Sequence, residues 1–307
     1  MKRIDFENGT ITGNILGAAL PMLVAQILNL LYNIVDRIYI ARIPEIGTAA
    51  LGAVGLCFPI IVIITAFSNL FGTGGAPLFS IFRGKKDSDT ARRIMNTSFT
   101  MLCVCAVILM AVGFLFARPI LILFGASADA IVYAYPYMML YLIGTLPSMI
   151  AVGMNPFINA QGYSSIGMLS VAIGAGTNLV LDPLFIFALG LGVRGAAIAT
   201  VISQCISAAL VVRCLVKETG PLRLDFRQLK IYPIKLKQIM QVGIPAGIQG
   251  MLFSLANVTV QSSVNSFGEV IMAGSSAAIS IEQFIYSNIN AFYQANVAFT
   301  SQNYGAG

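Results

Sequence analysis

Two acidic residues stand inside long apolar stretches of this sequence, where a charge needs a reason. Asp36 lies near the end of the apolar run 14–41, and Asp182 lies within the run 167–189. An ionised Asp at the centre of a membrane helix costs about 2.5–3.5 kcal/mol to insert. We therefore expect each carboxyl group to be protonated, to bind a cation or to face a water-filled cavity.

The most specific pattern is the sequence GAGTNLVLDP. Asn178 and Asp182 are four residues apart, so a helix places both side chains on one face. Pro183 has no amide proton, which leaves the carbonyl of Leu179 without its helical donor. With Thr200 in the next apolar run, these oxygens suit Na⁺ or a proton. Hydrogen bonding between membrane helices is the alternative explanation for the same residues.

The run that carries Asp36 also contains a proline. Pro21 lies fifteen residues before Asp36 and removes the donor for the carbonyl of Gly17. The sequence thus predicts a helix that can bend at Pro21 and that carries a titratable group. The alternative is that Asp36 reaches water at the helix end, beside Arg37.

Other polar side chains recur in and just after the apolar runs, where they could line a cavity. We predict a substrate cavity lined by Gln26, Asn29, Asn33, Tyr137 and Asn155. Asn155, together with Asn159 and Gln161, lies in the loop expected after the 131–154 span.

The composition places the chain among multi-pass membrane proteins. Hydrophobic residues make up 57% of the 307 residues and charged residues 10%, against about 25% charged in soluble domains. The sequence has no histidine, which excludes histidine metal sites and Ser-His catalysis. It also lacks a phosphate-binding loop and a nucleophile elbow, so we expect a protein that is neither an enzyme nor driven by ATP.

Eight spans can be drawn, and the basic residues between them indicate an orientation. With the N-terminus in the cytoplasm, fourteen of the eighteen Lys and Arg residues lie inside, including Lys2 and Arg3. This bias follows the positive-inside rule, so the net charge of +6 reflects topology and not nucleic-acid binding. The spans are 14–41, 49–82, 94–116, 131–154, 167–189, 193–216, 238–265 and 270–300.

The only long polar stretch, 217–237, divides the chain. Leu222, Phe226 and Leu229 recur there at helical spacing among basic residues, which predicts an amphipathic linker helix on the cytoplasmic membrane surface. Partner binding by this segment is the alternative. The predicted domains are a six-helix lobe at 1–216, the linker at 217–237 and two helices at 238–307.

The sequence after the linker resembles its own beginning. VGIPAGIQGMLFSLANV resembles AALPMLVAQILNLLYNI, with Pro245 in the place of Pro21. Two repeated bundles that face each other are a common transporter plan. We therefore expect the chain to be a piece of a twelve-helix protein and, at 307 residues, not to transport by itself.

Several of these stretches together resemble the MATE (multidrug and toxic compound extrusion) family. The matching sequences are LPMLVAQILNLLYNIVDRIYIAR, GAVGLCFPI, NPFINAQG, TNLVLDPLFIF and GAAIATVISQ. The resemblance implies an all-α, polytopic transmembrane bundle of two six-helix lobes, here with the second lobe truncated after its second helix. It also implies a cation-coupling site of Asp36, Asn178, Asp182 and Thr200, which would ligate Na⁺ in a sodium-coupled member. Glu282 receives no role.

The function that the resemblance implies is export of amphipathic, often cationic drugs and toxic compounds in exchange for Na⁺ or H⁺. Neutralisation of Asp36 would let its helix bend at Pro21 and narrow the pocket. No cofactor other than the coupling ion is expected. The alternative is a flippase for lipid-linked oligosaccharides, which has a related fold but would be expected to have a basic cavity.

The expected partners are membrane lipids and small amphipathic or cationic substrates, with no nucleic acid. We expect a monomer in the cytoplasmic (inner) membrane of a prokaryote, multi-pass, with its N-terminus in the cytoplasm.

Overall fold

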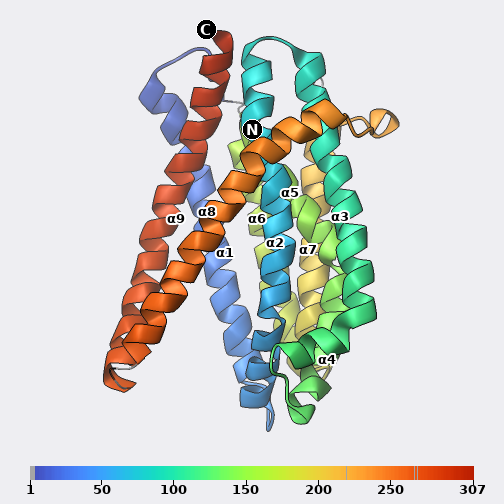
Figure 1. The fold of residues 1–307 in the computed structure, drawn as a ribbon, viewed down its shortest axis with the longest axis vertical. Helices are drawn as coiled ribbons and strands as arrows, with labels where there is room; N and C mark the ends of the chain where they lie inside the picture. Colours follow the sequence, from blue (N-terminus) through green and yellow to red (C-terminus); the bar gives the residue numbers. More distant parts are fainter. Residues whose placement is uncertain (1–3, 219, 266, 268) are drawn as a thin grey trace.

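The computed structural model describes residues 4–307 except 219, 266 and 268 (Figure 1). The described residues form helices joined by turns and contain no strand, so the predicted all-α class is confirmed. The α-helices are α1 (Ile11–Ala41), α2 (Gly47–Gly84), α3 (Ser88–Leu123), α4 (Ala128–Ile143), α5 (Thr145–Ala160), α6 (Ser164–Pro183), α7 (Val193–Lys217), α8 (Pro233–Asn265) and α9 (Glu269–Ala306). A π-helical turn, η1 (Leu184–Ala188), follows α6, and a 3₁₀ turn, η2 (Phe226–Gln228), precedes α8.

Within the described residues, five helical segments are long and apolar enough to cross a membrane: α1, α2, α3, α6 with η1, and α7. The pair α4 and α5 makes a sixth if it counts as one broken span. The predicted spans 238–265 and 270–300 are helical, as α8 and α9, but are not among these six.

The predicted span 131–154 is two helices. α4 and α5 meet at an angle of 56°, with Gly144 between them. The N–H of Gly144 bonds the carbonyl of Tyr141 at 2.9 Å, which closes α4 with a tight turn. Asn155 and Asn159, which we expected in a loop, therefore lie within α5, and Gln161 follows its last residue.

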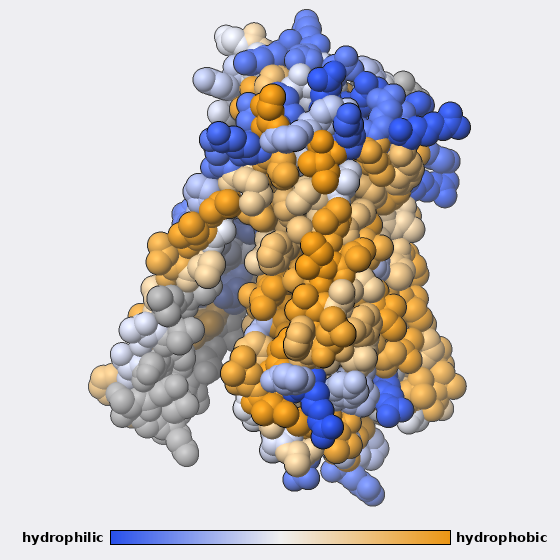
Figure 2. Space-filling view, turned by 45° about the vertical axis from the view of Figure 1, so that its right-hand side comes forward, coloured by the Kyte–Doolittle hydropathy of each residue, from blue (hydrophilic) through white to orange (hydrophobic). Residues whose placement is uncertain are grey.

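The surface has the banding of a membrane protein. Figure 2 shows a broad hydrophobic band between a hydrophilic upper end and scattered hydrophilic side chains at the lower end. The α2–α3 turn and the start of α8 lie at the upper end (Figure 1), which agrees with the predicted grouping of basic residues on one side of a membrane. Lys2 and Arg3, also assigned to that side, lie outside the described residues.

Helix α2 is the centre of the bundle, and glycines let its neighbours approach closely. A Cβ on Gly72 would lie 2.7 Å from the carbonyl oxygen of Gly153 on α5. A Cβ on Gly74 would lie 2.7 Å from the carbonyl oxygen of Ile239 on α8. Because lipid tails give helices no hydrophobic drive to associate, such close backbone packing holds membrane bundles together.

The linker is not the amphipathic helix that its spacing predicts. Between α7 and α8 the described residues contain only the single turn η2, and residues 233–237 of the predicted linker already belong to α8. Leu222 and Leu224, two residues apart, are both buried. The N–H of Leu224 bonds the carbonyl of Leu215 at 2.9 Å, which folds the linker back onto the end of α7. Gly220 and Pro221 precede this segment and disfavour a helix there.

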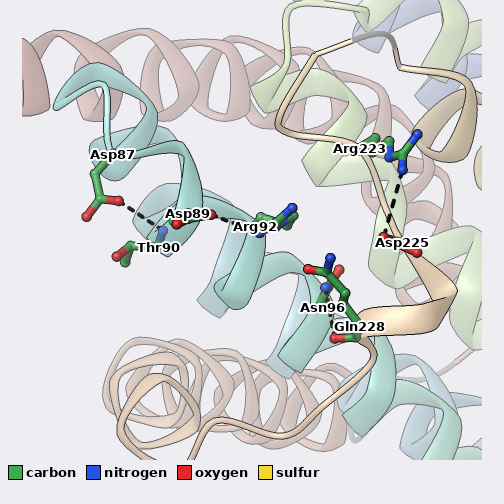
Figure 3. Close-up of polar contacts among 8 residues, drawn as sticks. All are labelled: Asp87, Asp89, Thr90, Arg92, Asn96, Arg223, Asp225 and Gln228. Atoms are coloured by element: carbon green, nitrogen blue, oxygen red, sulfur yellow. Dashed lines mark hydrogen bonds and ion pairs between the residues drawn. The ribbon is translucent and has the colours of Figure 1, made fainter.

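Buried amide side chains fix the linker to the bundle. The side-chain nitrogen of Gln161 donates to the carbonyl of Leu222 at 3.1 Å. That of Asn96 donates to the carbonyl of Gln228 at 3.3 Å, and Figure 3 shows this contact beside the Arg223–Asp225 ion pair. These linker carbonyl groups therefore accept their hydrogen bonds from side chains of the bundle and not from water.

The N-terminal segment 4–10 ties α1 to α9. The Phe6 side chain is 1% exposed and meets Phe299 edge-on, with ring centroids 6.1 Å apart. The side-chain nitrogen of Asn303 donates to the carbonyl of Phe6 at 3.3 Å. The N–H of Ile4 donates to the carbonyl of Gly162 at 2.9 Å, so the same segment also contacts the α5–α6 turn.

Replacement of Phe6 by Ala should destabilise this end of the bundle. Truncation of a fully buried Phe costs about 3–5 kcal/mol in a well-packed core. We expect Phe6→Ala to lower the Tm of the purified chain in detergent. Ile11→Ala is the matched control, because Ile11 is 65% exposed and should leave the Tm close to that of the parent. Equal Tm values for Phe6→Ala and the parent would contradict the tie.

Asp87 caps the beginning of α3, and the contribution of this cap to stability should depend on pH. Its side chain accepts a hydrogen bond from the N–H of Thr90 at 3.0 Å (Figure 3). Hydrogen bonds from Thr90 lower the pKa of Asp87 below its ordinary value. A lowered pKa contributes stability above the ordinary Asp pKa, and that stability is lost as the pH falls through the lowered value.

Asp87→Ala should therefore lower the free energy of unfolding by about 1 kcal/mol at neutral pH. Asp87→Asn keeps an N-cap acceptor and should remain close to the parent. Thermal unfolding measured over a pH series should show the gap between parent and Asp87→Ala narrowing below about pH 4. A gap that stays constant at all pH values would exclude the charged cap.

Candidate functional site

The packing of α1 against α6 brings together the two acidic residues that the sequence singled out. Asp36 lies five residues before the end of α1, and Asp182 lies next to the last residue of α6. Their carboxyl groups are close enough to form a hydrogen bond with each other through a shared proton. Both lie in the half of the bundle away from the N-terminus and the α2–α3 turn (Figure 1).

The amide of Asn178 joins this pair to α7. Its side-chain nitrogen lies 3.4 Å from Oδ1 of Asp182 and 3.5 Å from Oγ1 of Thr200. Asn178 is 1% exposed and Asp182 is 0% exposed, whereas Asp36 and Thr200 are half-buried. The structure thus brings all four predicted residues into one cluster at the meeting of α1, α6 and α7.

Three buried oxygens of this cluster have no hydrogen-bond partner among the described residues: Oδ1 of Asp36, Oδ1 of Asn178 and Oδ2 of Asp182. Buried acceptors without a donor are costly, and a second carboxylate nearby adds repulsion. A cation or a proton between them would supply the missing positive charge. The donor set therefore fits a small monovalent cation or a proton.

The end of α6 is irregular beside the cluster. Pro183 has no N–H, so it cannot donate to the carbonyl of Leu179. The chain continues as the π-helical turn η1, a form that is frequent at functional sites. The irregularity positions Asp182 at the point where the α-helical hydrogen-bond pattern is interrupted.

Two tyrosines also stand beside the acidic pair, and sequence reasoning missed one of them. Tyr32, one turn before Asp36, lies near enough to both carboxyl groups to interact with them electrostatically. Its spacing of four residues from Asp36 was the available signal. Tyr137, a predicted cavity residue, also lies near Asp36, but it is buried and stacks on Tyr141 with centroids 6.1 Å apart.

The three predicted amide residues of α1 share one face with Asp36. Gln26, Asn29 and Asn33 follow at spacings of three and four residues, and Asn29 and Asn33 are exposed. The side-chain nitrogen of Asn33 donates to the carbonyl of Asn29 at 2.6 Å. A polar stripe on a membrane helix avoids lipid, so this face suits a water-filled cavity.

The side chain of Asn155 forms hydrogen bonds between α5 and α6. Its side-chain nitrogen donates to the carbonyl of Gly167 at 3.2 Å and to Oγ of Ser170 at 3.3 Å, which joins α5 to α6. Its Oδ1 accepts a hydrogen bond from Asn159 at 3.2 Å. The structure thus places Asn155 in the α5–α6 contact, and its role in a substrate cavity stays a prediction.

Within the part of the chain that the structure describes, no contact assigns a role to Pro21 or Glu282. Pro21 is half-buried inside α1, which is helical from Ile11 to Ala41. Glu282 is exposed on α9. The part of the chain that the structure describes contains no cluster of three or more His, Cys, Asp or Glu residues that could hold a metal ion.

The sequence profile of the MatE family matches residues 21–184, which is more than half of the chain. This chain belongs to the MatE family. The match covers Asp36, Asn178 and Asp182, and it confirms the resemblance drawn from the motifs.

Individual members of the MatE family are also similar to this chain in sequence. The multidrug export protein MepA of Staphylococcus haemolyticus is 25% identical over 279 residues, which are 91% of this chain and 61% of MepA. A protein named FAD transporter from Shewanella oneidensis is 26% identical over 301 residues, covering 95% of this chain and 65% of that protein. The chain thus spans less than two thirds of the length of these curated relatives.

A solved structure has the same fold. The outward-facing conformation of a multidrug resistance MATE transporter superposes with a TM-score of 0.89 at 26% identity, covering 100% of this chain and 68% of that one. The MatE chain is therefore a multi-pass membrane protein whose helices are arranged as in MATE transporters.

The acidic pair should make the stability of this MatE protein depend on cations. Because a proton or Na⁺ offsets the repulsion between the two carboxylates, the parent should gain Tm when Na⁺ replaces choline or when the pH is lowered. Asp36→Asn and Asp182→Asn remove one charge each and should lose this gain. Thermal unfolding in detergent, with and without Na⁺ at several pH values, measures it.

Glu282→Gln is the matched control, since it removes one exposed carboxylate far along the chain from the cluster. It should respond to Na⁺ and pH as the parent does. A response that survives in both Asp36→Asn and Asp182→Asn would show that the cation acts elsewhere.

Proposed function

We propose that this MatE protein exports amphipathic compounds across the cytoplasmic membrane in exchange for a monovalent cation, Na⁺ or H⁺. The observation that carries the proposal is the set of three buried, partnerless oxygens of Asp36, Asn178 and Asp182. They gather where α1 meets α6, within a bundle whose surface is otherwise a hydrophobic band.

The first step of the proposed cycle is cation binding between the two carboxyl groups. Oxygens of Asp36, Asp182 and Asn178 surround the ion, and Thr200 adds a hydroxyl from α7. A proton would instead be shared between the two carboxyl groups. In either case the pair loses one negative charge, which lowers the cost of keeping it away from water.

The second step is a change in α1. This helix packs mainly against α6 on one side and α9 on the other, so a change at Asp36 reaches both lobes. Pro21 leaves the carbonyl of Gly17 free and makes bending at this level less costly than elsewhere in α1. A bend would move the polar stripe of Gln26, Asn29 and Asn33, which we propose as the substrate-facing surface.

The substrate class is supported by that stripe and by the relatives. Amide side chains beside an acidic pair suit amphipathic and cationic compounds, because they offer acceptors without a competing positive charge. MepA is named a multidrug export protein. A flippase for lipid-linked oligosaccharides would need several basic groups at this place, and no observation favours it.

The proposed setting follows from charge and hydropathy. We propose a monomer with its N-terminus in the cytoplasm, because the basic α2–α3 turn and linker lie at one end of the hydrophobic band. Transport, and not an enzymatic reaction, is the proposed activity, and the coupling ion is its second substrate.

Competition between drug and ion tests the proposal. Binding of a fluorescent cation such as ethidium to the purified full chain should weaken about fivefold or more when Na⁺ is added or the pH is lowered, a coupling typical of linked sites. Asp36→Asn should bind ethidium with an affinity that no longer depends on the ion. Fluorescence anisotropy in choline and in Na⁺ buffers at several pH values separates Na⁺ from H⁺.

Glu282→Gln serves again as the control and should retain the competition. Ethidium binding that is equally ion-dependent in Asp36→Asn and in the parent would overturn the proposed coupling. Ethidium binding that no ion affects, even in the parent, would overturn it as well.

A further inference from the structure

A groove on the outer surface of the bundle lies between the beginning of α6 and the end of α7. Its volume is about 340 Å³, and it is far along both helices from the acidic pair. It is lined by Tyr163, Ile166, Leu169, Ser170, Leu210, Arg213, Cys214, Lys217 and Glu218. The proposed transport cycle uses none of these residues.

The rim of the groove is basic. Arg213 and Lys217 are one helical turn apart on α7, and both are exposed. Neither forms an ion pair or a hydrogen bond within the part of the chain that is described. Glu218 lies at the same rim, so the three charged groups together carry a net charge of +1. Two positive side chains are thus available to an anion.

The rest of the groove is mostly apolar. Ile166, Leu169 and Leu210 form its walls, and Leu169 is 38% exposed. The hydroxyl of Ser170 donates to the carbonyl of Gly167 at 2.7 Å, so the helix already uses this donor. An occupant therefore needs an anionic group at the rim and an apolar part below it.

The position of the groove along α6 and α7 indicates what kind of molecule occupies it. Lys217 ends α7, directly before the polar linker, at the end of the molecule that holds the α2–α3 turn (Figure 1). In the membrane orientation proposed above, this is the level at which lipid phosphates meet water. Basic residues between transmembrane helices on the cytoplasmic side typically bind the head groups of anionic lipids.

We propose that this groove binds an anionic phospholipid, with its phosphate at Arg213 and Lys217 and an acyl chain along Ile166, Leu169 and Leu210. A bound lipid would hold the ends of α6 and α7 together. Because the same helices carry Asp182 and Thr200 at their other ends, the lipid would also support the frame of the cation site.

Native mass spectrometry of the purified full chain tests the lipid site. Phosphatidylglycerol should bind at least about fivefold more tightly than phosphatidylcholine of the same chain length, which corresponds to one basic contact near the membrane surface. The double variant Arg213→Gln/Lys217→Gln should lose this preference. Its unchanged Tm in neutral detergent would show that the variant is folded.

Arg227→Gln/Lys230→Gln is the matched control, because it removes two exposed basic residues from the same end of the molecule but outside the groove. It should keep the preference for phosphatidylglycerol. Equal losses in both double variants would reduce the effect to general charge attraction and overturn the site. Binding of glycerol 1-phosphate as tight as that of the lipid would also overturn it, since that compound has no acyl chain.

Discussion

The burial of two carboxyl groups against each other is the constraint on which this bundle depends. Asp36 and Asp182 come from helices that are far apart in the sequence, and they meet in a region where each charge is costly. Asn178 and Thr200 supply only neutral groups beside them. In the proposed cycle a positive charge completes the α1–α6 contact, so the contact itself would sense the ion.

The remainder of the bundle provides a firm frame for this contact. Backbone approaches at Gly72 and Gly74 hold α2 tightly against α5 and α8. α1 packs mainly against α6 and α9 and much less against α2. A helix outside the tight core can change its shape without breaking the glycine contacts. In the proposed cycle, the cation site is thus divided between a framework side, on α6 and α7, and a side that adjusts, on α1.

Local spacing predicted part of the site, and tertiary packing determined the rest. The interval of four residues between Asn178 and Asp182 fixes their common face, and the structure keeps it. No interval in the sequence could place Asp36 beside Asp182, because that contact depends on how α1 crosses α6; the family resemblance supplied it. Tyr32 was missed although it shares a face with Asp36, because the apolar ring of a tyrosine equally fits ordinary helix packing.

The error in the linker has a physical cause, which is that polar groups satisfy each other across helices. The apolar spacing of Leu222, Phe226 and Leu229 predicted a helix, but buried side chains of Asn96 and Gln161 bind the linker backbone and stabilise an irregular path. Asn155, which we predicted to line a cavity, likewise bonds α6. A polar residue in a membrane bundle has both uses, and its type alone does not distinguish them.

The small number of charges in the site is itself suited to exchange. Three or more carboxylates would favour a divalent ion and hold it tightly. Two carboxylates, one amide and one hydroxyl give a monovalent cation enough charge to enter and leave a residual repulsion of one negative charge. In the proposed cycle, release of the ion then needs only that water or a competing cationic substrate reach the same helix face. A site with complete charge neutralisation would bind more strongly but would turn over poorly, since a transported ion must leave in every cycle.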